Sequence, residues 1–198
     1  IVAKILKEDG NINILKRNEL EDLSKSFAWD LRSLINKTNN EQLKLFGIIG
    51  ASEESLIMML SSAWLGAHHS ICFEDLSEEA IQKRIEIFNP DIIICREQVK
   101  LKAIRVIDNL KKKDIKLKII NIGELKKYQN LHSINSQKAN IYQKHSPLFT
   151  LYTSGSTGKP KGIVHNARKF FEYANFTTKY FFGINKYSVI FTATDVGW

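Results

Sequence analysis

Residues 151–165 read LYTSGSTGKPKGIVH, and this stretch carries the strongest signal in the sequence. Residues 148–152, at its start, are apolar and aromatic, which predicts a strand. Gly155 and Gly158 then allow backbone conformations that other residues avoid, and the serines and threonines around them compete with regular secondary structure. Such a loop presents successive N–H groups and hydroxyls to one anion. We therefore predict a loop that binds the phosphates of a nucleotide.

Two other interpretations of this loop have to be weighed. The Walker-type P-loop requires two glycines five apart, followed by Lys and Ser or Thr. Here Gly155 and Gly158 are three apart, and Pro160 follows Lys159. Clusters of Gly, Ser and Thr are also common in ordinary surface turns. The full segment TSGSTGKPKG, residues 153–162, is more specific, and it resembles the phosphate-binding loop of the adenylate-forming superfamily (acyl-CoA synthetases, luciferases and peptide-synthetase adenylation domains).

The resemblance implies a role for each residue of the loop. In that superfamily a carboxylate attacks the α-phosphate of ATP, and the β- and γ-phosphates leave as pyrophosphate. N–H groups, hydroxyls and lysine charges suit the negative charge that develops there. ATP, Mg²⁺ and coenzyme A are the implied cofactors, and no residue is assigned to the metal. The implied catalytic residue is Lys161, and the implied cofactor-binding residues are Thr153, Ser154, Gly155, Ser156, Thr157, Gly158 and Lys159.

The composition is that of a globular protein. The chain has 198 residues, of which 43% are hydrophobic and 25% charged, and this length allows one sizeable core. We expect no membrane span and no export leader, because no apolar run reaches about 18 residues. Cys72 and Cys95 each lie in an apolar run, which favours buried, reduced thiols and a cytoplasmic location over a disulfide.

The formal net charge of +8 raises the alternative of a basic nucleic-acid-binding domain. The aromatic residues that a stacking platform requires are not interleaved with the lysines, and no helix-turn-helix or zinc-finger spacing is present. Lysines near a helix C-terminus also suit the helix dipole, so a solvated helix end accounts for them. We expect no nucleic-acid partner. The densest lysine cluster comprises Lys111, Lys112, Lys113, Lys116 and Lys118.

The hydrophobic pattern predicts strands that alternate with helices. Asn18, Ser52, Ser77 and Asn166 are expected to cap helices at their N-termini. Because the strands are apolar on both faces, we predict an α/β fold, a mostly parallel sheet with helices on both faces. The expected helices cover 18–35, 52–66, 77–89, 99–110 and 166–176, and the expected strands cover 45–50, 68–73, 91–95, 117–122, 148–152, 162–165 and 187–193.

The resemblance extends beyond the loop. Residues 47–73, GIIGASEESLIMMLSSAWLGAHHSICF, resemble a strand–helix–strand segment of acyl-CoA synthetases, and 192–198, TATDVGW, resemble a segment of acetyl-CoA and propionyl-CoA synthetases. This implies that residues 1–198 form part of the large N-terminal ATP-binding (AMP-binding) domain of an adenylate-forming enzyme, with the C-terminal domain absent. The implied reaction joins a short carboxylic acid, acetate or propionate, to coenzyme A through an acyl-adenylate. An adenylation domain that delivers its acyl group to a carrier protein is the alternative, and the chain alone is expected to be inactive.

One departure from the family lies at residues 73–77, FEDLS. Acetyl-CoA synthetases have two glycines beside the coenzyme A nucleotide where this chain has Glu74 and Asp75. Two acids there would repel phosphates, or they lie on the far side of the turn. The nearest counterparts of the family's phosphate-binding arginines are Lys100, Lys102 and Arg105, for which a solvated helix face is an equally good interpretation. His165 is expected to be structural, because no other metal ligand lies near it at a suitable spacing.

Overall fold

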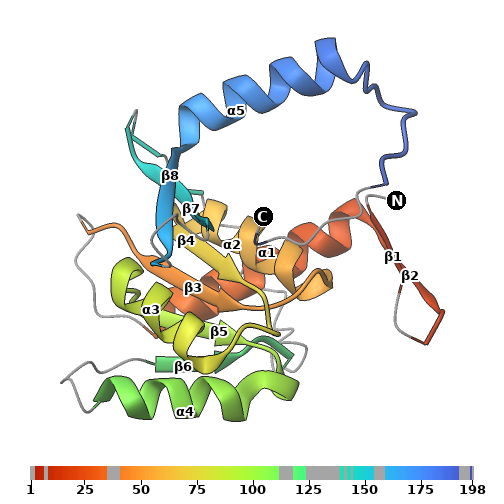
Figure 1. Cartoon of the computed structure of the whole chain (residues 1–198). Helices are drawn as coiled ribbons and strands as arrows, with labels where there is room; N and C mark the ends of the chain where they lie inside the picture. The colour runs from red at the N-terminus through yellow and green to blue at the C-terminus, as the bar shows by residue number, and fades with distance from the viewer. Residues whose placement is uncertain are drawn as a thin grey trace.

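The structure is a computed structural model (Figure 1) that describes residues 3–6, 9–34, 41–111, 118–123, 139–140, 142–143, 145–153, 159–191 and 197. Its centre is a six-stranded sheet in the order β6-β5-β3-β4-β7-β8. The first five of these strands are parallel to their neighbours, and β8 runs antiparallel to β7. The predicted α/β fold with a mostly parallel sheet is thus confirmed. The strands are β3 (Lys44–Ile48), β4 (His68–Cys72), β5 (Ile92–Cys95), β6 (Lys118–Asn121), β7 (Pro147–Thr153) and β8 (Lys161–Asn166).

Helices cover both faces of the sheet. On one face α1 (Arg17–Ser33) and α2 (Glu53–Leu65) pack on alternate residues of the strands, among them Leu45 and Ile71. On the other face α3 (Glu78–Phe88) and α4 (Lys100–Lys111) pack on the residues between, such as Phe46 and Cys72. Successive side chains of a strand point to opposite faces, so strands buried on both sides read as continuous apolar runs. Cys72 and Cys95 are buried thiols, as predicted.

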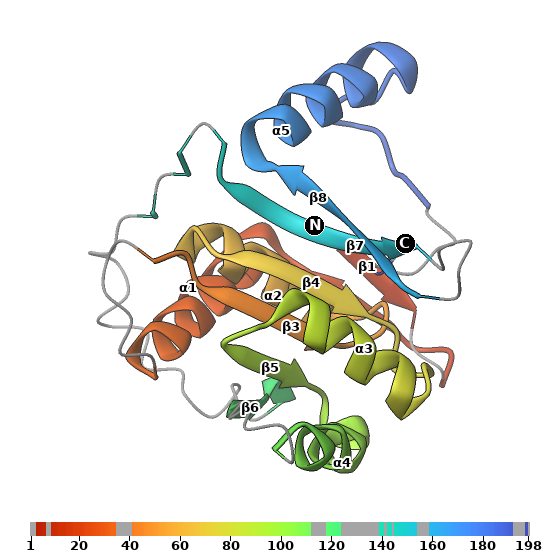
Figure 2. The same cartoon turned by 60° about the vertical axis from the view of Figure 1, so that its left-hand side comes forward.

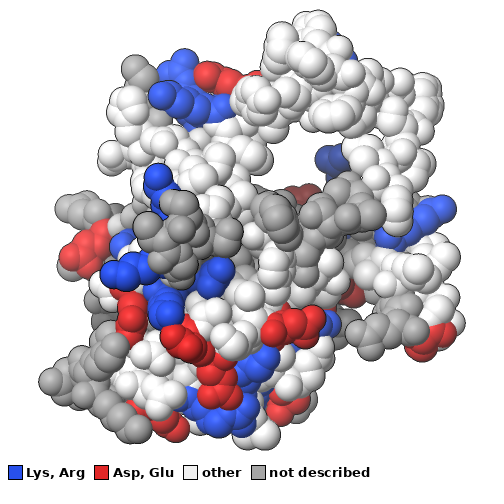
Figure 3. All heavy atoms as spheres, in the orientation of Figure 1, with Lys and Arg blue, Asp and Glu red and all other residues white. Residues whose placement is uncertain are grey.

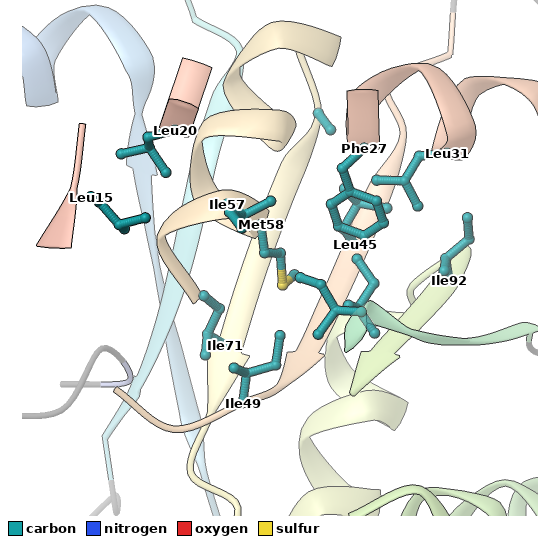
Figure 4. Close-up of a cluster of buried hydrophobic side chains, with 13 residues drawn as sticks. Leu15, Leu20, Phe27, Leu31, Leu45, Ile49, Ile57, Met58, Ile71 and Ile92 are labelled. Atoms are coloured by element: carbon teal, nitrogen blue, oxygen red, sulfur yellow. The ribbon is translucent and has the colours of Figure 1, made fainter. Parts of the chain in front are cut away.

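Gly47 sets how closely α2 approaches the sheet. A Cβ atom at this position would come within 2.6 Å of the Met58 sulfur and 3.2 Å of Ile71 Cγ1. In Figure 4 the Met58 side chain reaches from α2 into the space between the sheet and the helices. The absence of a side chain at residue 47 therefore lets α2 lie directly on β3.

Most predicted helix ends are confirmed. The Ser52 hydroxyl accepts from Ser55 N–H at the start of α2, and Ser77 caps α3 in the same way. α2 ends at Gly66, whose φ of 65° lies in the left-handed region that glycine adopts without a Cβ clash. The prediction for α1 was wrong, because the N-cap is Lys16 rather than Asn18. Leu15 ends the preceding strand in the core, and the helix begins directly after it.

A two-stranded antiparallel hairpin at the N-terminus was not predicted. Its strands, β1 (Ala3–Leu6) and β2 (Ile12–Leu15), pair only with each other. Each strand is four residues long, and Leu6, Ile12 and Ile14 are exposed. Strands this short carry little periodic signal. The hairpin is anchored by Leu15 in the core and by a 2.6 Å hydrogen bond from the Asn13 side chain to Glu53.

The C-terminal part differs from the expectation. α5 (Ala167–Phe176) is present and continues into a π-helical turn, Thr177–Phe181, but Asn166 does not cap it with its side chain. That side chain donates to the His145 carbonyl instead. The strand predicted at 187–193 is wrong over residues 187–191, which have no strand structure, and Val189 is 89% exposed. An apolar run forms a strand only where a neighbouring strand pairs with it, and residues 192–193 lie outside the described residues.

Candidate functional site

The predicted phosphate loop is carried by a β-hairpin. β7 and β8 pair in antiparallel register, and Thr153 lies directly opposite Lys161. Thr153, Lys159 and Lys161 are exposed at the end of this hairpin where the loop connects its strands. The hairpin thus brings together the two ends of the predicted site. Ser154, Gly155, Ser156, Thr157 and Gly158 lie outside the described residues.

Tyr152 and Gly162 shape the hairpin just below the loop. A Cβ atom at Gly162 would come within 3.0 Å of Thr150 Cγ2 and 3.1 Å of Tyr152 Cε1, so glycine leaves room for the tyrosine ring. The Tyr152 hydroxyl donates to the Arg84 carbonyl of α3 over 3.2 Å. Burial raises the pKa of Tyr152 to about 12, so this hydroxyl keeps its proton and its hydrogen bond at neutral pH.

β7 is joined to the rest of the sheet by a seam with β4. His68 Nε2 lies 2.8 Å from Thr150 Oγ1, and the Ser70 hydroxyl donates to the Thr150 carbonyl over 2.8 Å. On the other face of the strand, the His69 and Phe149 rings have centroids 5.8 Å apart. Burial lowers the pKa of His68 to about 4 and that of His69 to about 3. Both imidazoles are therefore neutral at pH 7.

His165 belongs to the same group of rings. Its ring stacks on Phe149 at 4.6 Å and 23°, and Phe149 meets Phe170 edge-on at 4.8 Å. This supports the structural role expected for His165. Among the residues that the structure describes, no three His, Cys, Asp or Glu side chains are grouped so that they could hold a metal ion. Over the same residues, no helix combines the length and the apolar character that crossing a membrane requires.

The two ends of the predicted loop, Thr153 and Lys161, lie at the carboxyl edge of the parallel sheet. Because β7 is parallel to β4, Thr153 ends its strand at the same edge as Cys72 of β4 and Cys95 of β5, as the arrows in Figure 2 show. Gly197 also lies at this edge, where an added Cβ would come within 2.9 Å of the Phe73 ring. Open α/β sheets bind ligands in the crevice outside the carboxyl ends of their strands. The hairpin therefore places the predicted loop where this fold binds ligands.

Glu74, just after β4, is held by a network that was not predicted. Arg96 Nε and Nη2 each lie 2.5 Å from one oxygen of its carboxylate. Gly50 N–H and the Gln98 amide also donate to it, each over 3.1 Å. Burial opposes ionisation, but the hydrogen bonds from Arg96, Gly50 and Gln98 lower the pKa of Glu74 below its ordinary value. The carboxylate is therefore ionised and fully engaged.

The two positions at which the chain departs from the family thus differ from each other. The Glu74 side chain is only 12% exposed and points to Arg96, so neither of the two expected arrangements describes it. Asp75 is exposed to solvent. The basic residues expected nearby also differ in their contacts. Lys102 Nζ donates to the Glu74 and Leu76 backbone carbonyls at 2.6 and 3.3 Å, whereas Arg105 pairs with Glu78 on the surface.

Charge around the sheet is mixed. In Figure 3 blue and red side chains alternate over the helices below the hairpin, while the projecting arm formed by α5 and the segment after it is mostly white. Exposed aromatic residues account for much of that arm, including Phe171, Tyr173, Phe181 and Phe182. In the lysine cluster, Lys111 ends α4 and Lys118 starts β6, and Lys112, Lys113 and Lys116 lie outside the described residues.

Sequence comparison connects this geometry to a known class of protein. Residues 16–198 match the family model described as AMP-binding enzyme. The acetyl-coenzyme A synthetase of Escherichia coli K12 is 32% identical over 167 residues, which cover 73% of this chain and 26% of that protein. The acetyl-coenzyme A synthetase of Chlorobaculum tepidum is 29% identical over 211 residues, which cover 96% of this chain and 31% of that protein. The chain belongs to the AMP-binding enzyme family, which confirms the resemblance seen in the sequence.

Structural comparison agrees. A solved acyl-CoA synthetase from Brucella canis superposes with a TM-score of 0.79 at 14% identity, over 98% of this chain and 35% of that one. At this identity the likeness shows a shared fold. The chain spans about a quarter to a third of the length of the curated relatives described above.

Proposed function

We propose that the protein joins a short carboxylic acid, acetate or propionate, to coenzyme A in an ATP-dependent reaction that passes through an acyl-adenylate. The observation that carries this proposal is the position of Thr153 and Lys161, within the segment TSGSTGKPKG, on a hairpin at the carboxyl edge of a parallel sheet. We further propose that residues 1–198 supply part of the N-terminal ATP-binding domain, and that the C-terminal domain lies outside this chain. Relatives named acetyl-coenzyme A synthetase support the choice of acid and of coenzyme A.

The proposed role of the loop follows from its chemistry. Thr153, Lys159 and the segment 154–158 would hold the β- and γ-phosphates of ATP, and the Lys161 ammonium would stabilise the pyrophosphate as it departs. The exposed, opposed positions of Thr153 and Lys161 fit a ligand with several charged oxygens. Each charge-assisted hydrogen bond to such a ligand contributes roughly 1.5–3 kcal/mol. Mg²⁺, bound with ATP, would neutralise part of the negative charge on the phosphates.

The proposed partners are small molecules, namely the acid, ATP and coenzyme A, and we propose neither a nucleic acid nor a membrane. Acidic side chains stand among the basic ones on the face seen in Figure 3, which gives little support to a continuous nucleic-acid-binding surface. The buried thiols of Cys72 and Cys95 support a reducing compartment such as the cytoplasm.

The test measures both half-reactions on the intact protein. Exchange of labelled pyrophosphate into ATP should depend on acetate or propionate, and adding coenzyme A should yield the matching acyl-CoA. The 198-residue chain alone, assayed in parallel, should yield no acyl-CoA above the blank. Exchange that depends only on an amino acid, with transfer to a carrier protein, would instead support the alternative adenylation domain. Retention on DNA or RNA that weakens steeply with salt, without any exchange, would contradict the proposal.

A further inference from the structure

The carboxylate of Glu74 is surrounded by hydrogen-bond donors from two separate parts of the chain, the segment after β3 and the segment after β5. One oxygen accepts from Arg96 Nε at 2.5 Å and from the Gly50 N–H at 3.1 Å. The other accepts from Arg96 Nη2 at 2.5 Å and from the Gln98 amide at 3.1 Å. Each oxygen thus receives two hydrogen bonds. Four donors converge on one small anion that belongs to the protein itself.

The same donors have the chemistry that recognises a phosphoryl group. The planar guanidinium of Arg96 presents two parallel N–H groups, which fit a carboxylate and a phosphate equally well. Gly50 lies two residues before Ser52, the N-cap of α2, at the end of the helix where the dipole is positive. Two of the three donor groups, the backbone N–H and the amide side chain, are uncharged, so they serve any oxyanion.

The location also favours a ligand. β3 lies between β5 and β4 in the sheet, and the helix after β3 packs on one face while those after β4 and β5 pack on the other. The connections that follow β3 and its neighbours therefore diverge to opposite faces of the sheet at the carboxyl end of β3. This is where open α/β sheets bind anionic ligands. In this protein, the Glu74 side chain fills that place.

The local charge favours an anion even without Glu74. Lys102 Nζ donates to the Glu74 and Leu76 backbone carbonyls, so this cation stays in place whatever side chain stands at position 74. The other acids nearby are directed elsewhere. Glu97 contacts Asn121 and Lys100, and Asp75 is exposed to solvent.

We propose that Gly50 N–H, Arg96 and Gln98 form a binding site for a phosphoryl oxyanion, which the protein occupies with its own Glu74 carboxylate. A phosphate group and Glu74 then compete for the same four donors, and the side chain acts as an internal competitor that an incoming group has to displace. Position 74 is also where the family has a glycine beside the coenzyme A nucleotide, but this inference does not rest on the proposed acyl-CoA chemistry, because its test uses inorganic phosphate and no enzymatic activity.

The experiment is a chemical rescue with inorganic phosphate. Glu74→Ala removes four heavy atoms, including both carboxylate oxygens, and leaves Arg96 and its fellow donors around an opening of about the size of a phosphate ion. The intact variant is melted in phosphate and in sodium chloride of equal ionic strength, because phosphate also stabilises proteins by exclusion from their surfaces. Glu78→Ala is the matched control, since it removes an acid that pairs with an arginine, Arg105, at the protein surface. Glu74→Ala combined with Arg96→Ala removes the main donor.

The expected result is specific to the single Glu74 variant. Phosphate at about ten times its dissociation constant should raise the Tm of Glu74→Ala by about 2–4 °C beyond the chloride control. Wild type, Glu78→Ala and the double variant should show no such difference, and wild type should bind phosphate at least about tenfold more weakly in calorimetry. If Glu74→Ala folds only in phosphate, that rescue also supports the site. Equal effects of phosphate on all four proteins, or a Glu74→Ala variant that phosphate does not rescue, would overturn the proposal and leave Glu74 as a structural link.

Discussion

His69 provides a direct test of how the loop-bearing hairpin is joined to the sheet. Its ring is 7% exposed at the β4–β7 seam, and among the residues that the structure describes Nδ1 has no hydrogen-bond partner. Burial, together with the neighbouring charge of His68, lowers the pKa of His69 to about 3. Replacing His69 with Phe keeps a ring beside Phe149 and removes both the titrating group and the unpaired nitrogen. We expect this variant to be more resistant to acid than wild type.

The sign and size of the effect follow from proton linkage. As the pH falls below about 6.5, the imidazole of the unfolded chain takes up a proton. In the folded protein His68 stays neutral until about pH 4 and His69 until about pH 3. Over this window the unfolded state binds more protons, so the free energy of unfolding falls by about 1.4 kcal/mol per pH unit for each histidine. Between pH 6 and pH 4, His69 alone should thus remove about 3 kcal/mol of stability.

The assay is urea-induced unfolding, followed by circular dichroism at several pH values between 4 and 7. The curve of unfolding free energy against pH should be shallower for His69→Phe than for wild type by about 1.4 kcal/mol per pH unit. Thr150→Val is the control, because it removes the hydrogen bond to His68 and should lower stability by about 1 kcal/mol at every pH. Parallel curves for wild type and His69→Phe would refute the reasoning.

Two further predictions concern packing and the loop. Gly47→Ala should lower the free energy of unfolding by about 1–3 kcal/mol, because its Cβ would overlap the Met58 sulfur. Gly123→Ala, whose Cβ would meet only the Asn121 side chain at 3.4 Å, should lower it much less. Equal losses in the two variants would contradict this account. Lys161→Ala in the intact protein should slow pyrophosphate exchange about a hundredfold, roughly 2.7 kcal/mol, while presynthesised acyl-adenylate still reacts with coenzyme A. Lys169→Ala, which replaces an exposed lysine of α5, should change neither half-reaction. A Lys161→Ala variant that loses only thioester formation would show that the loop acts in that step and not in adenylation.

Much of the fold could be predicted because its signals are local. The apolar run at 92–95 is buried on both faces, and Ser52 and Gly66 mark the ends of α2 as their chemistry requires. Where the prediction was wrong, the deciding contact is not local. Residues 187–191 have the composition of a strand, but a strand forms only with a partner. The start of α1 was misplaced by two residues because Leu15, and not a capping side chain, determines where the helix begins.

The candidate site shows the same division. The residues of the predicted loop are contiguous, so the sequence alone could name them as candidates, and the hairpin register that sets Thr153 opposite Lys161 follows from the strands on either side. Glu74 and Arg96 are 22 positions apart, and the pattern around each shows only that an apolar strand has ended. Their meeting depends on the strand order, which places β3 between β4 and β5.

The strand order also explains why the Glu74–Arg96 ion pair lies across the end of β3, next to the Gly50 N–H. β4 and β5 flank β3, so a side chain that leaves the end of either strand reaches the other only by crossing the end of β3. The Gly50 N–H stands at that crossing and donates to the same oxygen of Glu74 as Arg96 Nε does. A sheet in which β4 and β5 were adjacent would allow the ion pair but would exclude this backbone donor. The backbone donor, and with it the resemblance to an oxyanion site, is therefore a consequence of the strand order and not of the two charged residues alone.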